Sequence, residues 1–275
     1  MTMWTSTDRH TLMLDVAVLR GLGQRFGAQT WPVVLDIEGV LDIDDAAAAR
    51  PALSHAELHQ RIAETELVCS DGEPTTLCDT VIRVLCAPER MIEMRTIADA
   101  GFRRICLARS GNDHVLAVRD GARIELSVVS PTGVGELGAL LRARLPERAP
   151  CVFDAISHPA AELLDRLGRC RSGLDMTDAL HAMGASPGDA MVVSAAFASC
   201  RVQTEIVAVA HDAGVLTQSS GAVAILDTDK GRIVSSPSKS PDGRVWTTLS
   251  PGSGHRIAQA IGLLIETLPD GRWFP

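Results

Sequence analysis

The chain has 275 residues and a formal net charge of −8, from 26 Lys and Arg against 34 Asp and Glu. This length fits one large globular domain or two closely packed domains. The acidic balance argues against a nucleic-acid partner and against binding to an anionic membrane, because both need a basic surface. Aromatic residues make up only 3% of the chain and tyrosine is absent, so stacking on nucleic-acid bases is not expected.

Targeting signals and cysteines predict the compartment. The N-terminal residues carry neither the basic nor the apolar region of a secretory signal, and no apolar stretch reaches about 18 residues. The seven cysteines form no C-x-x-C pair, and several lie in apolar runs, as is typical of free thiols in a reducing compartment. These features predict a cytoplasmic protein without membrane insertion.

In the first half of the chain, short strands alternate with helices. After a strand at residues 11–14, Asp15 is the expected N-cap of a helix that Gly27 ends. A second strand is expected at residues 31–37, and residues 36–50 are expected to form a solvated acidic connector. The remaining expected elements are helices at 54–68 and 75–87, strands at 91–97, 102–109, 114–119 and 122–129, and a helix at 132–144 with Ser130 as N-cap.

The four consecutive strands are separated by short links, and Asp120-Gly121 is a typical two-residue hairpin turn. Parallel neighbours need a long crossover connection, so these strands are expected to pair antiparallel.

The second half repeats this order. The expected elements are a strand at 151–156, helices at 159–170, 176–183 and 187–199, strands at 204–211, 222–227, 232–236 and 245–249, and a last helix containing Ile257 and Leu268. The stretch from Ser130-Pro131 to Leu145-Pro146 matches the stretch from Ser250-Pro251 to Leu268-Pro269. We therefore predict an α+β fold of two similar halves, residues 1–149 and 150–275, with pseudo-two-fold symmetry. A central antiparallel sheet, flanked by helical bundles, would give both halves one shared core.

A glycine motif offers an alternative function. Gly133 to Gly138 matches G-x-G-x-x-G, and Asp154 follows 21 residues after Gly133, a spacing typical of dinucleotide-binding enzymes. However, the preceding strands form hairpins and not a βαβ unit, and Ser130-Pro131-Thr132 separates strand from glycines. A role in starting the helix is therefore favoured over a nucleotide site.

No metal, cofactor or catalytic site is predicted. His55 and His59 lie one helical turn apart, but no third ligand has suitable spacing. Asp36, Glu38, Asp42, Asp44 and Asp45 lack the glycine and terminal glutamate of a calcium loop. No G-x-S-x-G elbow is present, so the sequence gives no reason to assign an enzymatic activity.

Several segments in order resemble the EspG family, the cytosolic chaperones of type VII (ESX) secretion. The segments that carry the resemblance are residues 222–237, 249–252 and 268–275 near the C-terminus, and residues 107–111, 114–121 and 204–208 in the meanders. The resemblance extends over residues 75–275. It implies two α/β halves around an antiparallel sheet and a non-enzymatic function. The expected partner is a PE–PPE heterodimer, bound at the apolar tip of the PPE subunit, or a related helical secretion substrate.

The resemblance also implies which surface binds the partner: the central sheet, the connection after the first meander strand, and the C-terminal helical bundle. Carried onto this sequence, the set is Ile97, Ala98 and Phe102 around the connection, Leu174, Met176, Leu180 and Met183 in the helices, and Val215 and Leu216 in the matching connection of the second half. Leu180 and Met183 are equally consistent with core positions. The connection at residues 98–101 is short, where many relatives carry a long loop, so Val215-Leu216 is the more attractive exposed anchor.

Three function classes follow. The first is a cytoplasmic chaperone that acts as a monomer or weak homodimer, and the second is a nucleotide-binding enzyme that uses Gly133 to Gly138. The third is a structural subunit of the secretion machinery.

Overall fold

The structure, a computed structural model, describes residues 11–39, 53–99 and 101–275. The strands of its sheet are β1 (Thr11–Asp15), β2 (Arg90–Ala98), β3 (Gly101–Ser110), β4 (Asp113–Asp120), β5 (Arg123–Val129), β6 (Ile156–Pro159), β7 (Cys200–Asp212), β8 (Val215–Gln218), β9 (Val223–Thr228), β10 (Gly231–Lys239) and β11 (Val245–Pro251). The helices are α1 (Val16–Arg25), α2 (His55–Ala63), α3 (Thr76–Cys86), α4 (Val134–Arg142), α5 (Ala160–Gly168), α6 (Gly173–Ala182), α7 (Pro187–Ala198) and α8 (Gly254–Glu266), with one 3-10 turn, η1 (Val33–Leu35).

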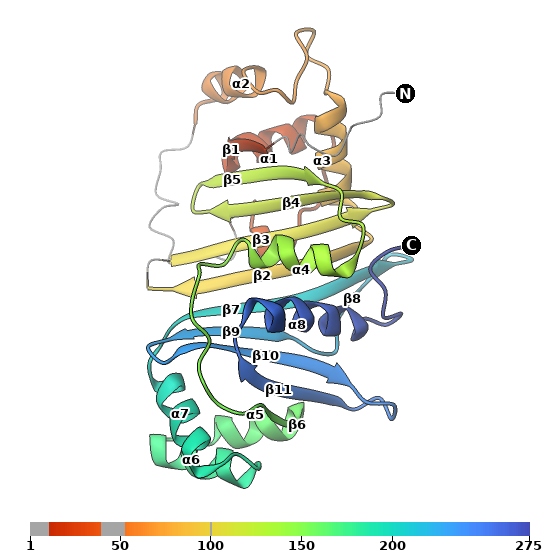
Figure 1. Cartoon of the computed structure of the whole chain (residues 1–275). Helices are drawn as coiled ribbons and strands as arrows, with labels where there is room; N and C mark the ends of the chain where they lie inside the picture. The colour runs from red at the N-terminus through yellow and green to blue at the C-terminus, as the bar shows by residue number, and fades with distance from the viewer. Residues whose placement is uncertain (1–10, 40–52, 100) are drawn as a thin grey trace.

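All eleven strands join one antiparallel sheet, which makes the fold α+β, as the sequence predicts. The strand order is β1-β5-β4-β3-β2-β7-β9-β10-β11-β6, and β8 pairs with one end of β7. The two four-stranded meanders meet where β2 pairs with β7, from Arg90 opposite Ala210 to Ala98 opposite Val202. Figure 1 shows α4 and α8 side by side across one face of the sheet, with α1–α3 at one end of the strand order and α5–α7 at the other.

Local sequence signals explain why these elements begin and turn where they do. Asp15 caps α1, since its carboxylate accepts a hydrogen bond from the Ala17 N–H at 2.9 Å. Ser54 and Glu57 form a capping box at the start of α2. Gly121 adopts a positive φ of 57° in the β4–β5 turn, which is the conformation that such a hairpin turn requires.

Three hydrophobic cores result from this layering. The first lies between the sheet and α4 with α8 and runs under both halves, from Leu116 of β4 to Val234 of β10. The second lies on the opposite face, beneath α1–α3 and η1, and the third lies on that same face beneath α5–α7. The middle of that face, where β2 meets β7, lies between the second and third cores.

The expected strand at residues 31–37 is wrong. Residues Val33–Leu35 form η1, and Asp36 ends it in the left-handed region at φ 45°. The Arg119 guanidinium donates hydrogen bonds to the carbonyl oxygens of Leu35 (2.7 Å) and Asp36. The buried Arg119 side chain thus occupies the carbonyl oxygens that would accept hydrogen bonds from a neighbouring strand. The apolar pattern instead reflects Leu35 and Ile37 entering the second core.

The expected solvated connector is wrong at its start, where Asp36 and Ile37 are buried, whereas Glu38 and Gly39 are exposed as expected. Asp36 is 6% exposed and its carboxylate lies 3.5 Å from the Arg119 guanidinium. Asp42, Asp44 and Asp45 lie outside the described residues.

Three smaller differences concern the ends of elements. The strand expected at residues 151–156 begins only at Ile156, because Cys151 makes a single backbone hydrogen bond to Arg232 and no ladder. Gly133, not Ser130, is the N-cap of α4. Strand β8 was not expected, since four exposed residues give no burial pattern to recognise.

The C-terminal segment is anchored to the sheet. Arg90, buried in β2, donates to the carboxylates of Asp212 at 3.1 Å and Asp270 at 2.6 Å. Trp273 is 2% exposed and its indole N–H donates to Nε2 of His114 at 3.1 Å. The last residues therefore belong to the first core.

Candidate partner-binding surface

The middle of the sheet presents exposed side chains on the face that carries α1–α3 and α5–α7. Paired residues of antiparallel strands share a face, so the register sets Phe102, Ile97 and Gln203 in one row across β3, β2 and β7. The next row holds Arg95, Glu205 and Ala224. We call this surface the open strip and define it as Arg95, Ile97, Phe102, Gln203, Glu205, Val207 and Ala224, which are all exposed or half-buried.

The alternate residues on the same strands explain why the strip faces away from α4 and α8. Met94 and Ile206, which neighbour Arg95 and Glu205 in the chain, are buried in the first core. Because side chains alternate between the two faces of a sheet, Arg95 and Glu205 must lie on the other face. The uncovered middle of the sheet is therefore a consequence of where the two helical bundles end.

The strip combines an apolar end with a charged centre. Phe102 is 40% exposed, and its ring is backed by the Arg104 guanidinium, 5.5 Å from the ring centroid. Ile97 lies directly opposite Phe102 in the β2–β3 ladder. One row further, the Arg95 guanidinium lies 2.9 Å from the Glu205 carboxylate. Both charged side chains are solvent-exposed, so this ion pair contributes at most about 1 kcal/mol and is readily exchanged for a partner's charges.

The strip is bordered by η1 on the side of the first half. Val33 of η1 is 66% exposed, and Val34 donates its backbone N–H to the Glu93 carboxylate. Burial raises the pKa of the Glu93 carboxyl above its ordinary value, and the hydrogen bond from Val34 opposes part of that rise. This hydrogen bond ties η1 to β2 at the edge of the strip.

The structure brings only some of the residues expected from the resemblance together. Ile97 and Phe102 pair on the strip, and Ala98 lies beside them at the hairpin, opposite Gly101 and Val202. Leu174, at the start of α6, is 71% exposed.

Two expected contact residues are core residues. Leu180 is 0% exposed and Met183 is 7% exposed, and both belong to the third core, against which Met176 packs. Side chains buried in this way have no surface to offer a docked protein, so Leu180 and Met183 are removed from the candidate surface.

Val215 and Leu216 lie far from Phe102 and Ile97, the apolar end of the strip. They are 63% and 61% exposed in β8, which pairs with the far end of β7 at Asp212 and His211. From Gln203, on the strip, to Asp212 is nine residues along β7, or about 30 Å at 3.3 Å per residue. The nine expected residues therefore fall into separate regions.

Five residues of the strip were not expected from the sequence: Arg95, Gln203, Glu205, Val207 and Ala224. Alternation within β2 places Arg95 on the same face as Ile97, and this signal was present in the sequence. No signal in the sequence indicated the pairing of β2 with β7, because their ladder joins residues more than 100 positions apart.

The glycine motif has a packing role in the structure. A Cβ at Gly138 would lie 3.0 Å from the Cα of Ala258, so this glycine allows α4 and α8 to approach closely. β5, which precedes the motif, pairs antiparallel with β4 and β1, and is not part of a βαβ unit. Within the described residues, no group of three or more His, Cys, Asp and Glu side chains is placed to hold a metal ion.

Comparison with known proteins identifies the family. The EspG family model matches residues 15–262. The chain belongs to the EspG family. The ESX-3 secretion-associated protein EspG3 of Mycolicibacterium smegmatis is 29% identical over 271 residues, covering 98% of this chain and 88% of the relative. The ESX-1 secretion-associated protein EspG1 of Mycobacterium tuberculosis is 31% identical over 206 residues, covering 74% and 69%.

A solved structure shares the fold. It is the Mycobacterium tuberculosis type VII secretion system chaperone EspG5 in complex with the PE25–PPE41 dimer, with a TM-score of 0.80 at 18% identity. The match covers 96% of this EspG chain and 98% of that one. Among the described helices of the present chain, none is long and apolar enough to cross a membrane.

Proposed function

We propose that this EspG protein is a cytoplasmic, non-enzymatic chaperone of type VII (ESX) secretion. It would bind the helical tip of a PE–PPE heterodimer, keep that substrate soluble and direct it to its own secretion system. The observation that carries the proposal is the fold shared over nearly the whole chain with a chaperone solved in complex with such a dimer. Exposed apolar ends of helical proteins aggregate unless they are covered.

The partner would dock on the open strip. Phe102 and Ile97 supply an apolar anchor at one end of the strip, beside a charged pair, Arg95 and Glu205, whose exposed ion pair a partner's charges can replace. The charges would set orientation and partner choice more than affinity. A helix is 10–12 Å wide with its side chains, so a two-helix tip of about 20 Å does not reach Val215 while it covers Phe102.

The sequence repeat supports a finer description of the fold. We infer that residues 1–149 and 150–275 are related by a pseudo-two-fold axis between β2 and β7. In each half a first strand is followed by helices, a four-stranded meander and a closing helix. In each, the first strand pairs with the last meander strand, β1 with β5 and β6 with β11. Superposition of one half on the other would test this inference.

The test of the function is co-expression with the PE–PPE pairs encoded beside the same secretion system. A soluble complex of one copy of each chain on size exclusion is expected. Failure with every such pair would refute the function.

Single substitutions then test the surface. Phe102→Asp and Ile97→Asp should each weaken the complex by about tenfold or more, as for central anchors of an interface. Met13→Asp is the matched control, because Met13 is an equally apolar, 57% exposed strand residue on β1 at the far edge of the sheet. Val215→Asp should also leave the complex intact. If Val215→Asp breaks it and Phe102→Asp does not, the partner docks at β8 and the strip is wrong.

A further inference from the structure

A second surface feature lies on the opposite face of the sheet, beside α4 and α8. It is a pocket of about 430 Å³ between the end of α4, the segment that follows it, and the start of α8. This volume is within the range of small-ligand sites. Its lining includes three arginines, Arg142, Arg148 and Arg232, together with Leu145, Glu147 and Ile257.

Three arginines line this pocket, and one of them is built into the fold. Arg232 is 4% exposed; its Nε and Nη2 donate to the two carboxylate oxygens of Asp227. This leaves Nη1 without a hydrogen-bond partner among the described residues. Asp227 fixes the guanidinium in place, so the free Nη1 is a preorganised donor at the pocket wall.

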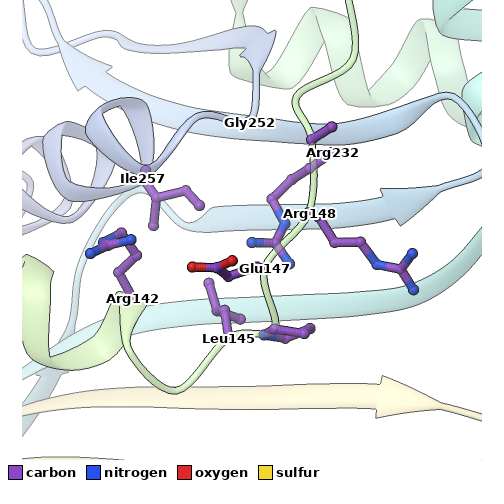
Figure 2. A pocket seen from close by; sticks show the side chains of 10 residues that line it. Arg142, Leu145, Glu147, Arg148, Arg232, Gly252 and Ile257 are labelled. Atoms are coloured by element: carbon purple, nitrogen blue, oxygen red, sulfur yellow. The ribbon is translucent and has the colours of Figure 1, made fainter.

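The other two arginines are free to bind. Within the part of the chain that the structure describes, the side chains of Arg142 and Arg148 make no ion pair or hydrogen bond. Figure 2 shows the Arg232 guanidinium pointing toward the Glu147 carboxylate, Arg142 on the other side of that carboxylate, and Arg148 extending away from both. Arginine is the side chain best suited to bind carboxylates and phosphates with paired hydrogen bonds.

Backbone groups add to this arrangement. Gly252 and Gly254 bring the chain close to the arginines: a Cβ at Gly252 would lie 2.2 Å from Cγ of Arg232, and one at Gly254 3.1 Å from Cδ of Arg142. The N–H of Gly254 begins α8 and has no acceptor among the described residues, as is usual in a first helical turn.

A carboxylate of the chain itself already lies in this position. Figure 2 shows the Glu147 carboxylate between Arg142 and Arg232, although it makes no ion pair with either of them. Glu147 is exposed and lies in an exposed segment, residues 146–150. Its side chain can therefore turn outward and leave the space to a ligand anion.

We propose that this pocket binds a small ligand carrying an oxyanion group with two or more negative charges, such as a phosphate ester or a polycarboxylate. Leu145 and Ile257 provide an apolar wall for a short carbon skeleton. No aromatic side chain lines the pocket, so a nucleobase would have no stacking partner. Glu147 competes with the ligand and lowers its affinity.

The experiment is titration of the full chain with inorganic phosphate and, separately, citrate, followed by calorimetry and by the backbone amide signals of Gly252 and Gly254. Saturable binding that shifts these signals is expected. Arg142→Ala should weaken it at least tenfold, and Glu147→Gln should strengthen it several-fold. Arg256→Ala is the matched control, because it removes the same charge from α8 outside the lining and should change the affinity less than twofold.

The two probes distinguish the ligand classes, since preference for phosphate indicates a phosphoryl group and preference for citrate a polycarboxylate. The proposal would be overturned by binding that does not saturate at about 10 mM phosphate or citrate. It would also be overturned if Arg142→Ala and Arg256→Ala weakened binding equally, as expected for a general effect of charge. The pocket and the open strip lie on opposite faces, so Arg142→Ala should still bind a PE–PPE pair. Loss of one activity therefore does not imply loss of the other.

Discussion

Removal of the Trp273 side chain tests whether the C-terminal segment holds the two halves together as the structure indicates. Trp273 is 2% exposed, packs in the core that runs under both halves, and donates to His114 on β4. Replacing a buried tryptophan by alanine removes its apolar contacts and leaves a cavity, which costs 3–5 kcal/mol. Trp273→Ala should therefore lower the free energy of unfolding by about 4 kcal/mol and the melting temperature by about 10 °C.

The assay is urea unfolding followed by far-UV circular dichroism, which does not depend on the tryptophan that is removed. Trp273→Phe keeps most of the apolar volume but leaves Nε2 of His114 without its donor, so a loss of about 1–2 kcal/mol is expected. Trp246→Ala is the control, since Trp246 on β11 is only half-buried and should cost less than Trp273→Ala. A loss below about 1 kcal/mol for Trp273→Ala would show that the C-terminal segment is not docked in solution.

Two further predictions concern pH and helix packing. Burial lowers the pKa of His114 below its ordinary value. The neutral ring therefore stabilises the fold above about pH 6.5, and this contribution is lost as pH falls through the lowered pKa. Between pH 7.5 and pH 5, urea unfolding should show that the free energy of unfolding falls more steeply for the wild type than for His114→Gln, and equal slopes would contradict this reasoning. At the glycine motif, Gly138→Leu should destabilise the fold by about 1–3 kcal/mol because it forces α4 away from Ala258. Gly135→Ala, where a Cβ meets no atom within 4 Å, should stabilise it by about 0.5–1 kcal/mol; thermal melts would show the opposite signs, and two losses of equal size would count against a packing role for Gly138.

Much of the fold was predictable because local physics decides it. The meander strands are short apolar runs joined by turns too tight for parallel pairing, and β2 to β5 form where they were expected. The helix caps at Asp15 and Ser54 act through hydrogen bonds to residues two or three positions ahead. Such signals are complete within a few residues of chain, so the sequence contains them in readable form.

The failures share a different cause. Residues 31–37 have a strand's apolar content, but Arg119, more than 80 positions away, binds the carbonyl oxygens of Leu35 and Asp36. Leu174 and Leu180 lie on the same helix, α6. No local sequence signal shows that Leu174 is exposed while Leu180 is buried in the third core. These outcomes depend on contacts with residues that are distant in the sequence, and a short stretch of sequence does not contain that information.

The amino-acid sequence by itself determined the two meanders, the repeated order of elements and the resemblance that the family comparison confirms. Tertiary structure alone decided that β2 pairs with β7, and this pairing creates the open strip by setting Ile97 beside Gln203 and Arg95 beside Glu205. It also brought Arg142 and Arg232 to one pocket. The reason is that strand alternation fixes which face a residue takes, whereas its neighbours on that face are set by long-range hydrogen bonding and packing.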